Sequence, residues 1–487
     1  MTAILSPACI MAVAIAVPFI AAAILPLFHR QPNLRETATL VAAGILFVLV
    51  ASLVGPVIGG VRPAWTAVQV MPAVAIAFSI EPLGMLFALI ASSLWIVNSI
   101  YSIGYMRGND EPRQTGFYVC FAIALGSTIG LAFSANLFTL FLFYEALTLS
   151  TFPLVTHHRD DESMKSGRLY LVMLLGASLL FFLPAIVATF VLAGTVDFRP
   201  GGVLAGTGAG VLAVLLGLYV FGIGKAAVMP MHRWLPAAMV APTPVSALLH
   251  AVAVVKAGVF SIVKVIVYIF GIETLTATGA ANWLLYVAGA SVLIASCIAL
   301  TRDNLKARLA YSTISQLSYV VLGAAILTPI SLIGAAMHIA AHAVCKITLF
   351  FAAGSIYTAA HLTKVSELDG IGRRMPFTMT AFAVGALGMI GLPPTAGFLG
   401  KWFMLSGAMS TANRVAVTVL IVSTLLNAAY FLPIVFRAFF RPSPKGAHGG
   451  EAPFPIVLAL TVTAIGAILL FLMPQIPLAL STQMMAR

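Results

Sequence analysis

Long apolar runs separated by short polar loops fill almost the whole chain. A hydrocarbon layer about 30 Å thick needs roughly 20 helical residues. Backbone groups that face lipid must be satisfied within their own segment, so each run is predicted to be a membrane-spanning helix. The pattern gives fourteen predicted spans, and the chain is expected to be an all-α polytopic membrane protein. Their approximate bounds are 3–27, 36–60, 76–102, 115–133, 136–156, 169–193, 208–236, 243–270, 282–301, 308–327, 330–359, 376–405, 413–436 and 455–475.

Composition supports this assignment. Hydrophobic residues make up 61% of the 487 residues and charged residues only 8%, whereas a soluble protein carries about 25% charged residues. The net charge of +12 does not indicate nucleic-acid binding, because no basic domain exists to present a patch. The four cysteines lie far apart in apolar segments, so we expect no metal site, no cofactor and no redox chemistry on this chain.

Basic residues in the loops predict the orientation. Loops after odd-numbered helices hold seventeen lysines and arginines, and the opposite side with both termini holds four. Positively charged loops stay in the cytoplasm. The odd-numbered loops are therefore expected to be cytoplasmic, and both termini to face outward.

Six charged residues lie deep inside the predicted spans, away from the loops. A charge at the centre of a membrane helix costs about 2.5 to 3.5 kcal/mol on insertion scales, so a functional role is the first hypothesis for each. Snorkelling to the headgroups is the alternative for Lys264, which lies in the outer half of its span. The six are Glu145, Lys225, Lys256, Lys264, Lys346 and Lys401.

Glu145 is ten residues into its helix, in "FLFYEALTLSTF", which is too deep for a short side chain to reach an interface. An opposite charge would stabilise its ionised form. We predict that Glu145 pairs with Lys225, and that making and breaking this pair controls proton occupancy.

Histidines add a second group of candidates. His338, His342 and Lys346 recur every four residues in "HIAAHAVCK", which places them on one stripe of a helix about 12 Å long. This pattern indicates a proton relay, with polar helix packing and a metal site as alternatives. His250 and Lys256 are six residues apart and would face different neighbours on a regular helix.

Two predicted helices, the seventh and the twelfth, contain a lysine among glycines and prolines. Their sequences are "GIGKAAVMPMHRWLP" and "GLPPTAGFLGKW". Interrupted helices in corresponding positions of two halves point to an ion site. An offset of five helices reverses direction, so helices 4–8 and 9–13 are predicted to be inverted repeats. The expected division is helices 1–3 (1–110), the first repeat (111–275), the second repeat (276–440) and a C-terminal helix (441–487).

These motifs resemble the antiporter-like membrane subunits shared by Mrp-type sodium/proton antiporters, respiratory complex I and membrane-bound hydrogenases. The resemblance covers roughly residues 75–440 and is carried by stretches such as "APTPVSALLHAVAVVKAG" and "RDNLKARLAYSTISQLSYVVLG". It implies that Glu145 pairs with Lys225 and that His250 and Lys256 form a central relay. It also implies a bridge through the stripe of His338, His342 and Lys346 to Lys401, near an outlet.

The D-type subunit of Mrp antiporters is the member that the chain resembles most. Lys401 departs from the glutamate of the M-type subunit of complex I, and the chain ends without the lateral helix of the L-type subunit. These two points favour a D- or N-like role. The resemblance implies a prokaryotic inner membrane, partner membrane subunits, and transport of protons and possibly Na⁺. Three alternatives stay open: a proton-pumping subunit of a redox complex, a carrier of small organic anions, and a structural subunit whose buried charges fix helix register.

Overall fold

The computed structural model describes residues 6–443 and 450–486. Eleven helices in this part of the chain are long and apolar enough to cross a membrane. They are α1 with η1 (Pro7–Phe28), α2 (Pro32–Ile58), α3 (Pro82–Gly108), α4 (Gln114–Ala132), α5 (Leu137–Val155), α6 with η2 and α7 (Asp161–Ala193), α10 with η5, α11 and η6 (Thr243–Phe270), α13 (Asn282–Thr301), α15 (Pro329–Ala360), α19 (Arg414–Phe440) and α20 (Phe454–Leu472).

Further helices complete the bundle. The predicted seventh span is in three pieces, the predicted twelfth is in two, and the predicted tenth is one polar helix, so the count of fourteen spans stays a prediction. The longer of these helices are α8 (Ala209–Gly222), α14 (Leu305–Ala325), α17 (Pro376–Ile390) and α18 (Gly397–Ser410). The short ones are η3 (Gly224–Ala226), α9 (Trp234–Ala237), η4 (Ala238–Val240), α12 (Ile272–Thr278), η7 (Val365–Glu367), α16 (Ile371–Arg374) and α21 (Gln475–Gln483).

An antiparallel hairpin corrects the all-α expectation. Strands β1 (Ala64–Met71) and β2 (Val74–Ser79) pair with each other, although the third helix was expected to begin at residue 76. β-Branched and aromatic residues favour this extended pairing, and Ala73 turns the chain with a φ of 64°. The helix therefore begins only at Pro82, whose fixed φ suits the first helical position.

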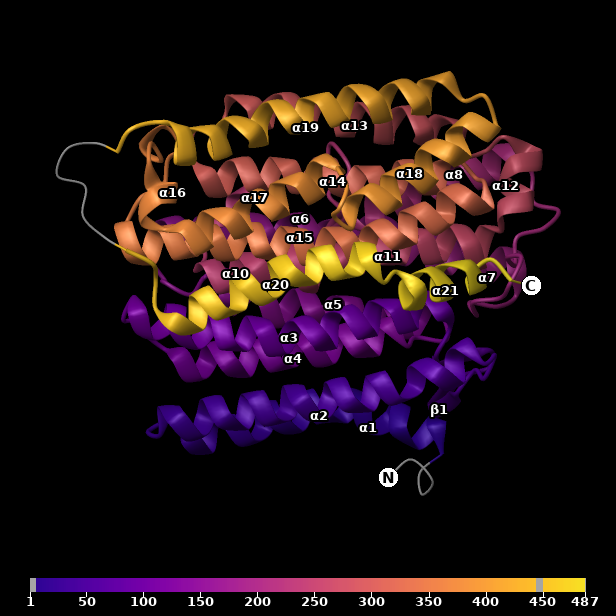
Figure 1. Ribbon diagram of the computed structural model, residues 1–487. Coiled ribbons are helices and arrows are strands. Elements are labelled where there is room, and N and C mark those ends of the chain that lie inside the picture. The colour runs from indigo at the N-terminus through magenta and orange to yellow at the C-terminus, as the bar shows by residue number, and fades with distance from the viewer. Residues whose placement is uncertain (1–5, 444–449, 487) are drawn as a thin grey trace.

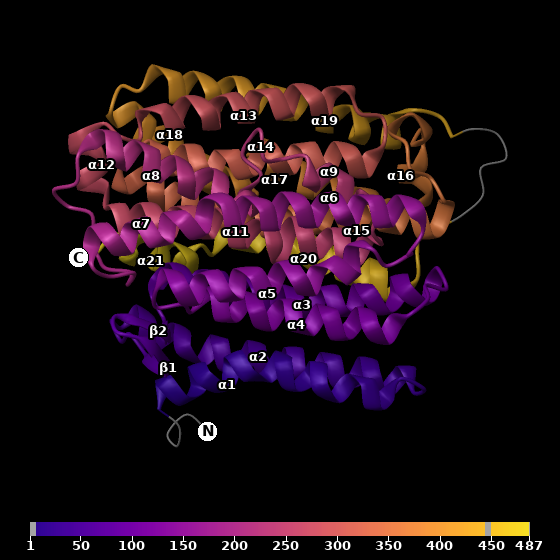
Figure 2. The same ribbon diagram turned by 180° about the vertical axis from the view of Figure 1, so that it is seen from behind.

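The helices lie side by side in an elongated bundle, with α1 and α2 at one end and α13 and α19 at the other (Figure 1). The hairpin, α21 and the start of α1 share one face, and α16 lies at the opposite face, as the reverse view also shows (Figure 2). We call these the terminal face and the opposite face. α8 runs from the terminal face to the middle, and α17 from the opposite face to the middle. These opposed directions agree with inverted repeats, which stay a prediction together with the domain bounds.

Two segments form the core of the bundle. Every residue of Thr243–Phe270 is buried, as is most of α15. Charged side chains on these segments therefore face other protein groups and not lipid.

Candidate functional site

The basic residues predicted for the relay all lie inside the protein. Lys401 is the most exposed of them, at 8%, and the others are at most 1% exposed. Glu145 is half-buried, and both of its carboxylate oxygens are shielded from solvent. The structure places these residues in two lysine sites, around Lys225 and Lys401, and in a central histidine region that hydrogen bonds connect to the Lys401 site.

Lys225 lies just after α8 ends, in the short helix η3. Its ammonium donates hydrogen bonds to the Tyr144 carbonyl oxygen (2.8 Å) and to Thr148 Oγ1 (2.5 Å) on α5. The same nitrogen is 3.1 Å from the centre of the Tyr144 ring, a favourable cation–π geometry. Gly258 on α11 allows η3 to pack here, since a Cβ at this position would lie 2.2 Å from the Ala226 nitrogen.

The predicted ion pair between Glu145 and Lys225 is not formed as a direct contact. Among the described residues, neither carboxylate oxygen of Glu145 has a hydrogen-bond partner. Tyr144 and Thr148 are four residues apart and share one face of α5, whereas Glu145 is turned about 100° from Tyr144. The carboxylate is still close enough to act electrostatically on Lys225.

The central region joins α11 to α15. The Lys256 ammonium donates a hydrogen bond to His342 Nδ1. Between His250 and Lys256 the helix is distorted, since Leu248–Val252 is a π-helix and Ala253 leaves regular helical geometry. His250 consequently lies within electrostatic range of His342 as well. Neither ring nitrogen of His250 has a hydrogen-bond partner in the described part of the chain.

A hydrogen-bonded bridge leads from the histidines to Lys401. His338 Nε2 donates to Gln316 Oε1 (2.8 Å), and Gln316 Nε2 donates to the Met389 carbonyl oxygen (3.1 Å). The Lys401 ammonium donates to the same carbonyl at 2.9 Å. Between His338 and His342 the ring centres are 6.3 Å apart, a gap that one water molecule can bridge. Side chains from four helices and the Met389 carbonyl of α17 thus lie between Lys256 and Lys401, with one gap between the two histidines.

The second lysine site uses the break between α17 and α18. Lys401 also donates to the Ile390 carbonyl oxygen at 2.9 Å, so its ammonium binds two carbonyls that the end of α17 leaves free. Gly391 follows with a φ of +88°, and a Cβ there would lie 2.7 Å from Lys401 Cδ. Tyr319 contributes its ring, 4.5 Å from the ammonium, and its hydroxyl at 3.4 Å.

The two remaining lysines have other partners. Lys346 donates to Ser312 Oγ at 2.5 Å, which ties its end of the stripe to α14. Lys264 is fully buried and forms an ion pair of 2.8 Å with Glu81. It also donates to the Ser134 carbonyl oxygen at 2.7 Å. The snorkelling alternative for Lys264 is therefore wrong, because its ammonium is bound inside the protein.

Several partners at these sites were not predicted from the sequence. Tyr144 and Thr148 hold Lys225, whereas Tyr319 and Asn427 share the Lys401 site through a hydrogen bond of 3.3 Å. The spacing of Tyr144 and Thr148 on the face beside Glu145 was a usable pattern. Asn427 lies one turn after Ser423 on α19, and both side chains hydrogen-bond to the Tyr319 hydroxyl, but nothing in the sequence relates this pair to α14.

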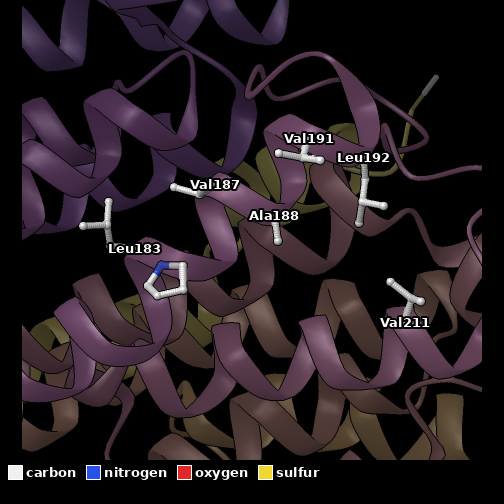
Figure 3. Close-up of a pocket in the computed structure, with 7 residues that line it drawn as sticks. Leu183, Val187, Ala188, Val191, Leu192 and Val211 are labelled. Carbon is white, nitrogen blue, oxygen red and sulfur yellow. The ribbon is translucent and has the colours of Figure 1, made fainter.

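Two other kinds of site were considered, a metal site and a surface pocket. Among the described residues, no group of three His, Cys, Asp or Glu side chains has the arrangement of a metal site. A surface hollow of about 680 Å³ lies between α7 and α8 and is lined by apolar residues, including Val187, Val191 and Val211 (Figure 3). Val191 is 76% exposed there, as a side chain that faces lipid would be.

The fold and the site define a polytopic membrane protein with buried basic and polar side chains in its core. Residues 134–427 match the family model described as NADH:quinone oxidoreductase/Mrp antiporter, transmembrane region. The chain belongs to this family. It is an antiporter-like membrane subunit of the kind found in Mrp and complex I-type complexes.

The relatives include subunits of NADH-quinone oxidoreductases and subunits of Na⁺/H⁺ antiporters. NADH-quinone oxidoreductase subunit N of Desulforudis audaxviator is 32% identical, over 77% of this chain and 75% of its own length. The A-type subunit of an Na⁺/H⁺ antiporter from Alkalihalophilus pseudofirmus is 28% identical over 92% of this chain, which spans only 60% of that relative.

Solved structures confirm the fold. A chain of the Mrp complex from Dietzia sp. DQ12-45-1b superposes with a TM-score of 0.88 at 21% identity, covering 100% of this chain and 97% of its own. A chain of an archaeal membrane-bound sulfane sulfur reductase gives 0.85 at 23%, covering 97% and 96%.

Proposed function

We propose that this chain translocates protons across the membrane as one subunit of a larger complex, through the buried line of Glu145, Lys225, Lys256, His250, His338, His342, Lys346 and Lys401. The observation that carries this proposal is the connection from Lys256 through the histidines and Gln316 to Lys401. Lysine and imidazole nitrogens can each bind and release a proton, and water can bridge the gaps between them.

The Lys225 site controls when a proton is bound. Its ammonium and the Glu145 carboxylate interact without a hydrogen bond between them. A rotation of either side chain would change their Coulomb energy strongly, because the interior has a low dielectric constant. Proton occupancy at Lys225 would change with it, and this change would pass on to Lys256.

The energy source for proton translocation that fits the D-type resemblance is a gradient of a monovalent cation such as Na⁺, which is exchanged for protons as in Mrp-type antiporters. A redox-driven proton pump of the complex I type is the second candidate. The similarity to a subunit N over 75% of that subunit favours it. In both cases the proton path in this chain is the same, and only the partner subunits differ.

The test is transport by the complex purified through a tag on this chain and reconstituted into vesicles. Lys256→Ala should abolish proton movement while the complex still assembles, because the central donor to His342 is removed. Undiminished transport in this variant would overturn the proposal. Proton movement driven by a Na⁺ gradient identifies an antiporter, and movement driven only by an electron donor identifies a redox pump.

A further inference from the structure

A cavity of about 260 Å³ lies apart from the lysine sites, where the ends of several helices meet. Its walls come from the end of α3, the loop after α5, η4, and the adjoining ends of α10, α14 and α15. Polar and apolar groups share the lining, so the cavity can hold water. The polar side chains among them include Tyr105, Glu111, His158, Thr243, Asn304 and Lys306.

Glu111 forms a carboxylate–imidazole cluster at this cavity. Its Oε2 is 3.2 Å from His158 Nε2 and 3.6 Å from His157 Nε2. The side chain of His158 is 36% exposed, whereas those of Glu111 and His157 are 9% and 4% exposed. His158 therefore meets solvent, and Glu111 links it to the interior.

The surroundings keep the two histidines in different states. The hydrogen bond to Glu111 raises the pKa of His158 above its usual value. Burial lowers the pKa of His157, so this imidazole favours the neutral form. A solvent-exposed imidazole with a raised pKa is suited to collect protons near neutral pH. The charged groups around it are Glu111, His157, Asp160, Lys306 and Arg113, whose guanidinium donates hydrogen bonds to the carbonyl oxygens of His157 and His158.

The cavity also has an inner end. Lys306 donates a hydrogen bond of 2.7 Å to the Ala241 carbonyl oxygen, and Thr243 Oγ1 donates to the Tyr105 hydroxyl at 3.4 Å. Thr243 begins α10, and His250 follows seven residues later, about 10 Å along the helix. Lys306 lies within electrostatic range of both Glu111 and His250.

His250 gives the second, independent observation. It is fully buried, and neither of its ring nitrogens has a hydrogen-bond partner among the described residues. An unpaired buried imidazole is costly, so water or a proton donor that reaches it from this cavity would satisfy it.

We propose that Glu111 and His158 load protons into this cavity, and that the passage continues past Lys306 and Thr243 along α10 to His250. This inference rests on the proposed function and assigns its site of proton uptake. The charge of the loops predicts that this face is cytoplasmic. A competing explanation is that the Glu111 cluster only pins the loop after α3 to the loop after α5.

The test is the pH dependence of proton uptake by the reconstituted complex, with Glu111→Gln and His158→Gln as variants. A collecting group matters most when protons are scarce, so each variant should lower the rate about tenfold at pH 8.5 and less than twofold at pH 6. Millimolar imidazole in the outer buffer should restore the rate at pH 8.5, because a mobile buffer replaces the missing collector. Glu162→Gln, an exposed carboxylate at the start of α6, is the matched control and should behave as the unmodified chain.

Two results would overturn the inference. One is an unchanged rate at pH 8.5 in both variants. The other is an equal loss at every pH without rescue by imidazole, which is the behaviour of a purely structural pin. If Glu111→Gln prevents assembly, His158→Gln alone decides, since it leaves the buried carboxylate with His157. A normal rate in Lys256→Ala would instead refute the proposed function itself.

Discussion

The two lysine sites have the same sequence pattern but bind their ammonium groups differently. At the second site, the break in the helix supplies the acceptors directly, because Met389 and Ile390 are the last residues of α17 and offer free carbonyls to Lys401. At the first site, the acceptors belong to a neighbouring, unbroken helix, and Lys225 is bound by Tyr144 and Thr148 of α5.

Charge separates the sites further. The Glu145 carboxylate interacts electrostatically with the Lys225 ammonium, whereas the direct partners of Lys401 are uncharged oxygens. The fixed carbonyls at a helix C-terminus favour a cation at all times. A carboxylate on a side chain can move. The comparison teaches that the same glycine and proline pattern builds a fixed cation site in one half and an adjustable one in the other.

The largest expected effect follows from this difference in charge. Lys225→Met would leave Glu145 as a shielded carboxylate without a counter-charge, and we expect a loss of about 3 kcal/mol of stability. Lys401→Met leaves only carbonyls without partners, so its loss should be about 1–2 kcal/mol. Thermal unfolding of the detergent-solubilised complex measures both.

The double variant Lys225→Met with Glu145→Gln is the control for this prediction. Removing the carboxylate should restore most of the stability that Lys225→Met loses. Equal losses in the two single lysine variants, or no rescue in the double variant, would mean that Glu145 does not interact with Lys225 and that the two sites are alike.

The second prediction concerns the bridge that only the second site possesses. Gln316→Leu removes both hydrogen bonds between His338 and the Met389 carbonyl, so transport should fall about tenfold, equivalent to about 1.4 kcal/mol in the barrier. Thr313→Val on the same helix is the matched control, because its hydroxyl bonds only within α14. Transport by Gln316→Leu at the rate of this control would exclude the bridge from the path.

Much of this comparison was predictable from the sequence, because charge inside an apolar run is conspicuous. The lysines, the histidine stripe and the breaks near Lys225 and Lys401 were located from pattern alone, since each violates the rule that membrane helices are apolar and regular. The histidines on the stripe lie buried against α11 and α14, which agrees with the four-residue spacing.

The partners were harder to predict, since they depend on how helices distant in sequence are rotated. The expectation for Glu145 assumed that opposite charges meet, but the rotation of α5 turns Tyr144 and Thr148 to the lysine instead. The hairpin was missed because the sequence prediction places residues 61–75 in a loop and residues 76–79 at the start of a helix, whereas both segments contribute to the two strands. Tertiary packing, which periodicity does not contain, decided the partners of Lys225, whereas the hairpin is a local pairing that its β-branched and aromatic residues favour.

The third prediction tests how closely the backbone fits Lys401. Gly391→Ala places a Cβ against the lysine side chain at a φ of +88°, which L-residues other than glycine adopt at a cost of about 1–2 kcal/mol. The unfolding midpoint should fall, and transport should fall with it because the ammonium is displaced from the end of α17. Gly176→Ala, with open space around it, is the control. An unchanged midpoint in Gly391→Ala would show that the second site is not tightly fitted.

The smallest expected effect is on stability and concerns His158, which lies outside both lysine sites. It compares an exposed charged group with the buried lysines. Glu111 raises the pKa of His158 through their hydrogen bond. The protonated imidazole therefore stabilises the fold below its usual pKa, and this contribution disappears as the pH rises through the raised value. Because His158 is 36% exposed, solvent screens the pair, and His158→Gln should cost only about 0.5 kcal/mol at pH 5.5 and nothing at pH 9. The unfolding midpoints of both proteins across this range provide the measurement, and a difference that grows with pH would show that His158 is not stabilised in its protonated form.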